Sequence, residues 1–222
     1  MSRDVLIAEV ASVLAAFCDP HPFRIGVDGR TGVGKTTFAD DLADALAMWN
    51  RHIIRAGLDG FHNPRDIRYA RGRLDPDGYY RDARDHAAIR RLLLDPLGPE
   101  GDGRYALESF DLHADQHVPP QGRQARSHDT ALICDGSFLQ RPELRDGFDC
   151  VIFLRSSAET SRARGLSRDG RHMCKVYDTR YLPAFDIYER EAQPEARASM
   201  VIDVEDVANP TLLRAMVPGQ LL

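Results

Sequence analysis

The chain has 222 residues, 43% of them hydrophobic, and a formal net charge of -5. This length suffices for one domain with a well-buried core, and the acidic balance argues against a nucleic-acid duplex as a partner. No apolar run approaches the length of a membrane span, so we expect no membrane-embedded segment.

Four cysteines are spread along the chain, at Cys18, Cys134, Cys150 and Cys174. They form no Cys-x-x-Cys pair, and two of them lie inside apolar, strand-like runs. We therefore expect reduced cysteines in a cytoplasmic protein.

The first patterned segment, residues 6–17, carries apolar residues at the spacing of one helix face. Asp4 and Glu9 interrupt its apolar character, and no basic segment precedes it. These features favour an amphipathic helix over a secretory signal.

Residues 23–28 form an apolar run that indicates a strand, and Gly29-Arg30-Thr31-Gly32-Val33-Gly34-Lys35-Thr36 follows at once. Behind this loop, apolar residues recur at helical spacing from Phe38 to Trp49. Strand, glycine loop and helix in this order are typical of a P-loop, in which backbone N–H groups and the helix N-terminus hold phosphates.

Two side chains of this motif have specific tasks, because Lys35 can reach the outer phosphates and Thr36 can ligate Mg²⁺. Only Lys35 and Lys175 are lysines among 29 basic residues, so a lysine at the required position is improbable by chance. The alternative is a glycine turn that binds nothing. The residues expected to hold the nucleotide are Gly29, Arg30, Thr31, Gly32, Val33, Gly34, Lys35, Thr36 and Thr37.

A second strand is expected at residues 53–58, and Asp59 follows it directly. Ligands of open parallel sheets bind at the carboxyl ends of the strands, so Asp59 is expected beside the phosphates. Residues 63–128 are rich in Pro, Gly, Asp and Arg and contain one clear helical pattern, at 87–94, with short extended pieces at 104–107 and 109–112. This segment is too long for a simple connection, which indicates a functional insertion, although each polar residue in it could equally be a solvated loop residue.

Three further apolar runs, 131–136, 150–154 and 200–204, complete the expected sheet. The first ends at Asp135, which suits an acid that holds Mg²⁺ directly or through water. A helix-capping or turn aspartate is the alternative.

Residues 155–180 hold the strongest local charge bias, with seven basic residues against three acidic ones. Such a segment fits a lid that closes over the nucleotide and neutralises a transferring phosphoryl group. A solvated helix face remains the alternative for any single arginine.

Several of these stretches together resemble the uridine kinase and phosphoribulokinase-like P-loop kinases, in particular bacterial uridine-kinase-like members. The matching stretches are residues 25–36, Leu58-Asp59-Gly60-Phe61-His62, residues 76–80, residues 134–139, Arg180-Tyr181, Pro194 and residues 201–203. They span most of the chain in a consistent order.

The resemblance implies an ATP-dependent, Mg²⁺-dependent kinase for a small-molecule alcohol. Asp59 corresponds to the catalytic aspartate that accepts the proton of the attacking hydroxyl, and Thr36 and Asp135 correspond to the metal site. Besides Asp59 and Lys35, the implied catalytic residues are the lid arginines Arg162 and Arg168, with Arg164 beside the nucleotide. The implied substrate-binding residues are Asp59, His62, Asp77, Tyr80, Phe110, Asp115 and Arg180.

Two positions depart from the family pattern. Asp115 stands near the place of a pyrimidine-reading histidine, and His62 replaces a tyrosine. A carboxylate only accepts hydrogen bonds, so it reads a base edge differently from histidine. The acceptor is thus left open between a nucleoside and another alcohol, such as a sugar, a sugar phosphate or a pantothenate-like molecule.

Two other classes of nucleotide-binding protein are less well supported by the sequence. A GTPase would need an Asn-Lys-x-Asp motif, but Asn50, Asn63 and Asn209 are followed by Arg, Pro and Pro. A nucleotide-binding regulator without catalysis is the second alternative, which the joint presence of Lys35 and Asp59 disfavours.

The expected fold is therefore a three-layer α/β P-loop fold with a mainly parallel sheet of about five strands. We expect one domain over residues 1–222, with a substrate-binding insertion at 63–128 and an arginine-rich lid at 155–180. The number of subunits is left open, and a homo-oligomer is compatible with the sequence.

Overall fold

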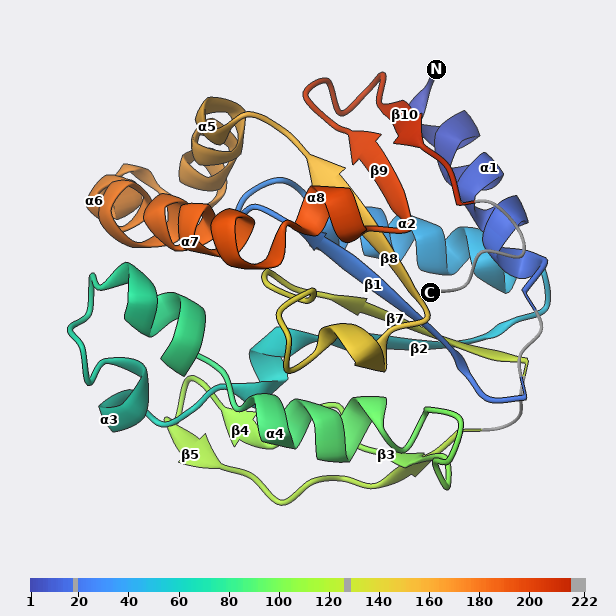
Figure 1. Ribbon diagram of the computed structural model, residues 1–222, viewed down its shortest axis with the longest axis horizontal. Coiled ribbons are helices and arrows are strands. Elements are labelled where there is room, and N and C mark those ends of the chain that lie inside the picture. The colour runs from blue at the N-terminus through green and yellow to red at the C-terminus, as the bar shows by residue number, and fades with distance from the viewer. Residues whose placement is uncertain (18–19, 126–128, 217–222) are drawn as a thin grey trace.

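A mainly parallel, six-stranded sheet forms the centre of the computed structural model, which describes residues 1–17, 20–125 and 129–216 (Figure 1). Its strand order is β10-β9-β8-β1-β7-β2. The strands are β1 (Phe23–Gly29), β2 (His52–Gly57), β7 (Thr130–Asp135), β8 (Cys150–Arg155), β9 (Met200–Asp203) and β10 (Thr211–Arg214).

The five strands expected from the apolar runs are all present, and they run parallel to one another. The sixth strand, β10, pairs antiparallel with β9 at the edge of the sheet. Its residues are mostly exposed, so they lack the apolar pattern that marks the buried strands.

Two layers of helices cover the sheet. Alternate strand residues such as Ile25, Ile133 and Ile152 pack against α1 (Arg3–Ala15) and α2 (Lys35–Ala47) on one face. On the other face, Leu132 and Val151 pack against the segment that begins with α4. Successive residues of each strand point to opposite faces of the sheet, and both faces are covered by helices, so the buried strands are continuous apolar runs in the sequence. The result is the three-layer fold predicted from the sequence.

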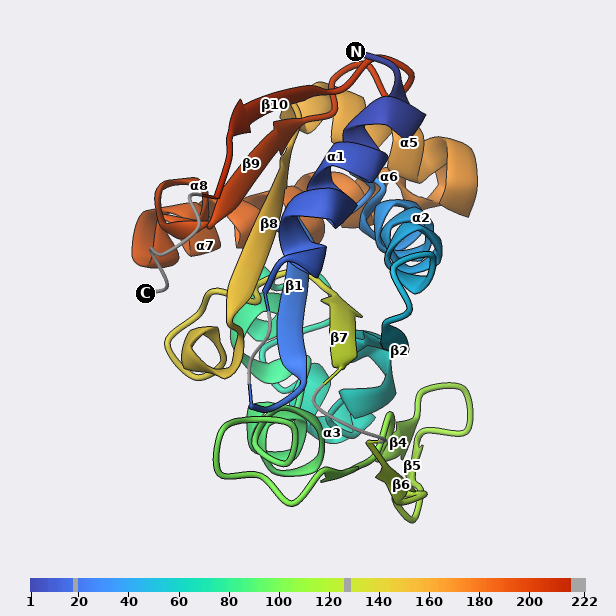
Figure 2. The same cartoon turned by 90° about the vertical axis from the view of Figure 1, so that its right-hand side faces the viewer.

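The two remaining regions are the insertion after β2 and the chain after β8. The insertion holds two short two-stranded sheets and lies beneath the central sheet, and the chain after β8 forms a helical group beside the P-loop (Figures 1 and 2). The insertion elements are α3 (Arg65–Arg68), a helical turn (Gly78–Asp82), α4 (His86–Ile89), which continues as a wider turn (Arg90–Leu94), β3 (Arg104–Tyr105), β4 (Phe110–Asp111), β5 (Gln116–His117) and β6 (Arg123–Gln124). The later helices are α5 (Ala158–Asp169), α6 (Cys174–Val176), α7 (Leu182–Ala192) and α8 (Pro194–Arg197).

The expected helix at 87–94 and the two extended pieces of the insertion are present as α4 with its extension, β3 and β4. Helix α3 and the turn Gly78–Asp82 were not predicted, because each is too short to show a periodic apolar face. The expected end of the insertion, His128, and Cys18 lie outside the described residues, whereas Cys134 and Cys150 are buried free thiols. None of the described helices has the length and apolarity needed to span a membrane.

A buried carboxylate joins the central strand to α7. Asp28, at the end of β1, is fully buried, and burial raises the pKa of its carboxyl group. Its Oδ1 accepts hydrogen bonds from the backbone N–H groups of Gly29 (2.8 Å) and Phe138 (3.2 Å). Its Oδ2 accepts from the Tyr188 hydroxyl of α7 and from Gln140 Nε2.

We expect Tyr188→Phe to lower the free energy of unfolding by about 1.5–3 kcal/mol, because it removes a buried donor to a carboxylate that has no access to water. Tyr177→Phe is the matched control, since its hydroxyl donates to the quarter-exposed Asp169, where water and Arg168 can replace the bond. Urea unfolding measures both. Equal losses in the two variants would contradict the role assigned to Asp28.

Candidate active site

A cavity of about 550 Å³ opens at the carboxyl ends of β1, β2 and β7. Because these strands are parallel, the residues that follow them meet at one edge of the sheet. The P-loop follows β1, Asp59 follows β2, and Asp135 ends β7, and all three contribute to the cavity wall.

The P-loop has the backbone geometry that its glycines permit. Gly32 and Gly34 have φ values of 87° and 104°, in the left-handed region that favours glycine. A Cβ on Gly32 would lie 2.3 Å from the carbonyl oxygen of Ser161, so α5 packs directly on this loop. Gly34 precedes the first turn of α2, whose N-terminus points toward the cavity as an anion site requires.

Lys35 lies in the cavity wall, where its Nζ donates to the carbonyl oxygens of Gly29 (3.0 Å) and Arg30 (2.8 Å). Burial lowers the pKa of Lys35 to about 8, against the opposing effect of Asp28 and Asp135. The phosphates of a bound nucleotide would place negative charge next to this ammonium group.

Thr36 and Asp135 form the oxygen-rich part of the site. The Thr36 hydroxyl donates to Asp135 Oδ2 at 2.7 Å, and Arg55 of β2 donates to Asp135 Oδ1 at 2.7 Å. No group of three or more His, Cys, Asp and Glu side chains in the described residues could hold a metal by itself. The donor set instead fits Mg²⁺, which takes one or two protein oxygens and completes its shell with phosphate and water.

Asp59 projects into the same cavity from the turn after β2, with 81% of its side chain exposed. Its Oδ1 accepts a hydrogen bond from Arg84 Nη2 at 2.8 Å, and this guanidinium group holds the pKa of Asp59 below its usual value. His62 lies beside the pair, and burial lowers its pKa to about 4, so its ring is neutral at pH 7. Asp59 is therefore an ionised hydrogen-bond acceptor that faces the space beyond the P-loop.

Known proteins resemble this chain in sequence and in fold. No protein-family model matches the sequence. The chain is 30% identical over 161 residues to a pantothenate kinase of Mycobacterium sp. (strain KMS), which covers 67% of this chain and 48% of that protein. The chain spans between a quarter and a half of the length of the curated relatives it matches.

Solved structures match over nearly the whole chain. A possible uridine kinase from Bacillus stearothermophilus superposes with a TM-score of 0.70 at 24% identity, covering 88% of this chain and 96% of that one. A putative fructose transport system kinase from Silicibacter sp. TM1040 gives a TM-score of 0.66 at 22% identity, with 87% and 97% covered. The chain has the fold of the P-loop kinases. The resemblance to uridine-kinase-like proteins noted in the sequence is confirmed at the level of fold.

In this P-loop kinase fold, the predicted lid arginines occupy different places. Arg168 lines the cavity and pairs with Asp169 at 2.7 Å. Arg162 does not line it and pairs with Asp178 instead. Arg164 donates to the carbonyl oxygens of Val204 and Glu205, both at 2.9 Å. The lid and its contacts with phosphate stay a prediction.

Some of the predicted substrate-binding residues line the cavity, and others do not. His62 joins Asp59 in the cavity wall, and the insertion adds Tyr79, Arg84 and Leu112. The wall does not include Asp77, Tyr80, Phe110, Asp115 or Arg180.

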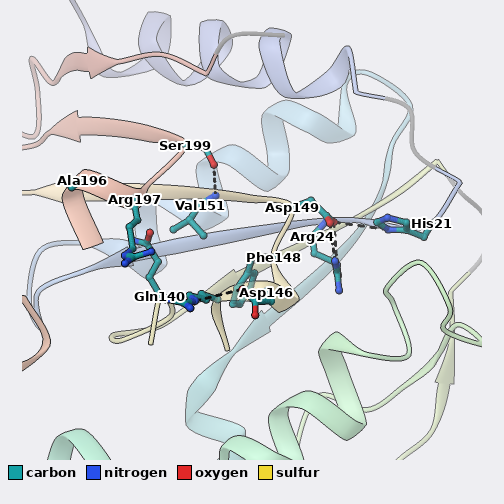
Figure 3. A pocket seen from close by; sticks show the side chains of 11 residues that line it. His21, Arg24, Gln140, Asp146, Phe148, Asp149, Val151, Ala196, Arg197 and Ser199 are labelled. Carbon is teal, nitrogen blue, oxygen red and sulfur yellow. Dashed lines mark hydrogen bonds and ion pairs between the residues drawn. The ribbon is translucent and has the colours of Figure 1, made fainter. Parts of the chain in front are cut away.

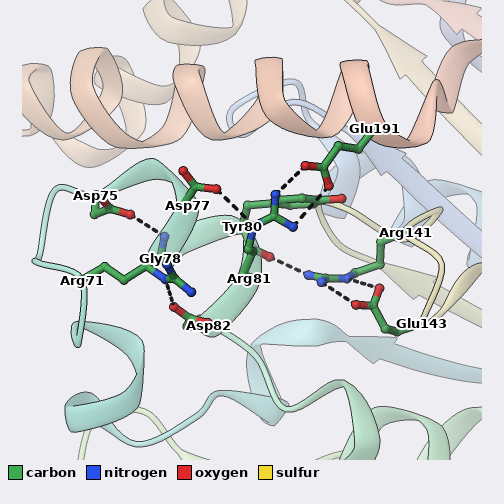
Figure 4. Close-up of polar contacts among 10 residues, drawn as sticks. All are labelled: Arg71, Asp75, Asp77, Gly78, Tyr80, Arg81, Asp82, Arg141, Glu143 and Glu191. Carbon is green, nitrogen blue, oxygen red and sulfur yellow. Dashed lines mark hydrogen bonds and ion pairs between the residues drawn. The ribbon is translucent and has the colours of Figure 1, made fainter.

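Each of these five residues has a protein partner or a packed environment. Asp77 pairs with Arg81, which also binds Glu191, as Figure 4 shows. Tyr80 is buried against the rings of Phe138 and Tyr188, and Arg141 donates to its carbonyl oxygen. Phe110 is buried in β4, Asp115 forms an ion pair with Arg68, and Arg180 stacks with tyrosines. Their roles in substrate binding stay predictions.

Arg84 and Arg55 belong to the cavity but were not predicted from the sequence. Each is one arginine among many in a charged chain, and its pairing with Asp59 or Asp135 depends on tertiary contacts. A weak signal existed for Arg55, which interrupts an otherwise apolar strand.

A larger cavity, of about 900 Å³, lies at the opposite end of the sheet (Figure 3). Arg24, at the start of β1, and Asp149, just before β8, form an ion pair in its wall at 2.7 Å. It contains none of the residues predicted to bind nucleotide or substrate.

We expect the affinity for Mg·ATP to fall as the pH rises through about 8. Lys35 has a lowered pKa, so its binding-competent cationic form is present below that pKa and lost above it. Calorimetric titration with a non-hydrolysable ATP analogue measures this affinity between pH 6.5 and 9.5. The range extends roughly one pH unit or more to either side of the Lys35 pKa. Lys35→Ala is the control: it should bind weakly at every pH, and an unchanged pH dependence in this variant would contradict the assignment.

Proposed function

We propose that the protein is an ATP-dependent kinase that transfers the γ-phosphoryl group to a hydroxyl of a small-molecule alcohol. The observation that carries this proposal is the presence of a P-loop lysine, a Thr36–Asp135 metal-type pair and a separate ionised Asp59 in one cavity. The names of the relatives support it, since they include pantothenate kinases and a possible uridine kinase.

The residues of the chain would divide the work between the two substrates. P-loop backbone N–H groups and Lys35 would bind the ATP phosphates, with Arg168 close to the transferring group. Mg²⁺, held by Thr36 and Asp135, would supply positive charge to the phosphate oxygens. Asp59 would orient the acceptor hydroxyl and take its proton on Oδ2, the oxygen that Arg84 does not bind.

The proposed acceptors are not limited to nucleosides. Asp115, near the place of a base-reading residue, is already bound by Arg68 and approached by Arg65 at 3.8 Å. An aspartate with these partners has fewer free acceptor sites for a base edge. We therefore keep sugars, sugar phosphates and pantothenate-like alcohols among the proposed acceptors.

We expect Asp59→Asn to lower kcat by about 10²–10⁴-fold, because an amide cannot accept the hydroxyl proton, while the affinity for Mg·ATP is preserved. ADP release in the presence of an accepted alcohol measures kcat, and calorimetry measures the affinity. Asp44→Asn, an exposed change on α2, is the control and should keep full turnover.

Undiminished turnover in Asp59→Asn would remove Asp59 from the role of base. Tight binding of Mg·ATP by the wild type without transfer to any alcohol would instead favour a nucleotide-binding regulator.

A further inference from the structure

The acceptor end of the cavity, formed by Asp59, His62, Tyr79, Arg84 and Tyr181, holds one cationic side chain, Arg84, beside one carboxylate, Asp59. We propose that the acceptor is an anionic alcohol, bearing a carboxylate or a phosphate, and that Arg84 binds its anionic group. This inference rests on the proposed kinase function and names the class of its second substrate.

Arg84 is a cavity-lining cation, yet it is only 8% exposed. A bridge between the backbones of His62 and Arg84 fixes its position, and its guanidinium group contacts Asp59 and the Tyr79 hydroxyl. A guanidinium group has five N–H donors, so these two contacts leave donors unused. One of them, Nε, is buried without a partner within the described part of the chain.

Two more buried arginines, Arg68 and Arg180, lie near His62 and Tyr79 of the cavity wall without lining the cavity themselves. Arg68 pairs with Asp115, whereas Arg180 has no carboxylate partner among the described residues. Arg180 donates to the carbonyl oxygen of Arg73 and stacks at 4.9 Å from the ring centre of Tyr79, which lines the cavity.

Of these three buried guanidinium groups, Arg84 pairs with Asp59 and Arg68 with Asp115, while Arg180 pairs with no carboxylate of the described residues. His62 adds no charge at pH 7, because burial and the neighbouring Arg84 lower its pKa to about 4. A buried positive charge without a counter-ion is unfavourable, and an anionic ligand would supply that counter-ion. A neutral nucleoside would leave the charge uncompensated.

The contact between Arg84 and Asp59 also determines where the hydroxyl and the anionic group of the acceptor would bind. Arg84 binds Oδ1 of Asp59, so Oδ2 can take the hydroxyl while the remaining guanidinium donors take the anion. Carboxylate and phosphate oxygens match the planar fork of arginine, and such pairs are stronger than neutral hydrogen bonds. The reactive hydroxyl and the anionic group would then lie close together in the acceptor.

Matched acceptors test this directly. The purified protein with Mg·ATP is assayed for ADP release with D-glycerate against glycerol, pantothenate against panthenol, and ribose 5-phosphate against ribose, with uridine and cytidine as further neutral acceptors. In parallel, [γ-³²P]ATP is incubated with a bacterial small-molecule extract that anion exchange has divided into neutral and anionic fractions. Charcoal removes nucleotides from the anionic fraction only, and Asp59→Asn provides the background in every assay.

We expect label and ADP release with anionic acceptors alone. Arg84→Gln should lower kcat/KM for the accepted anion by roughly 10²-fold, and Arg84→Lys should recover part of this loss, because it keeps the charge but not the fork. Arg71→Gln removes another arginine–aspartate pair of the insertion, with Asp82, outside the cavity, and should leave kcat/KM unchanged.

Transfer to uridine, glycerol or the neutral fraction with equal or higher kcat/KM would overturn the inference and leave the kinase function intact. An anion preference that persists in a folded Arg84→Gln variant would overturn the role of Arg84. Absence of transfer to every acceptor and both fractions, with Mg·ATP still bound tightly, would overturn the proposed function and this inference with it.

Discussion

The buried carboxylate of Asp28 is the contact on which the nucleotide end of the site depends. It accepts hydrogen bonds from the first residue of the P-loop, from the loop after β7, and from Tyr188 of α7. A second contact reinforces the same junction, since Arg30 of the P-loop pairs with Glu189 of α7 at 2.8 Å and lies over the Phe185 ring. These contacts fix the P-loop relative to the helices that follow β8, so its backbone can bind phosphate without rearranging.

The parallel sheet brings two further aspartates to the same edge and gives each a different environment. Asp135 lies between Thr36 and Arg55, whereas Asp59 lies against Arg84 and faces the insertion. Each carboxylate has an arginine partner from a neighbouring segment, and for Asp59 this partner, Arg84, lowers the pKa of the carboxyl group. Asp135 is thus suited to a metal ion and Asp59 to a hydroxyl. Lys35 of the P-loop lies in the wall of the same cavity.

Features that depend on a regular or contiguous sequence pattern could be predicted from the sequence. Five strands, the P-loop and the placement of Asp59 and Asp135 at strand ends all follow from apolar periodicity and a glycine motif. The roles of Arg84, Arg55 and Asp28 could not be predicted, because they depend on tertiary contacts with residues far away in the sequence. Asp77 and Tyr80 lie in a matching motif but point to Arg81 and to the aromatic core, since the turn Gly78–Asp82 sets their direction.

The separation of tasks between the two aspartates is the central claim, and the Mg²⁺ dependence of nucleotide affinity tests it most directly. Calorimetric titration with a non-hydrolysable ATP analogue, with and without Mg²⁺, compares the wild type with Asp135→Asn and Asp59→Asn. Mg²⁺ should tighten binding by the same factor in the wild type and Asp59→Asn, and this gain should be lost in Asp135→Asn. Loss of the gain in Asp59→Asn, or its full retention in Asp135→Asn, would contradict the account.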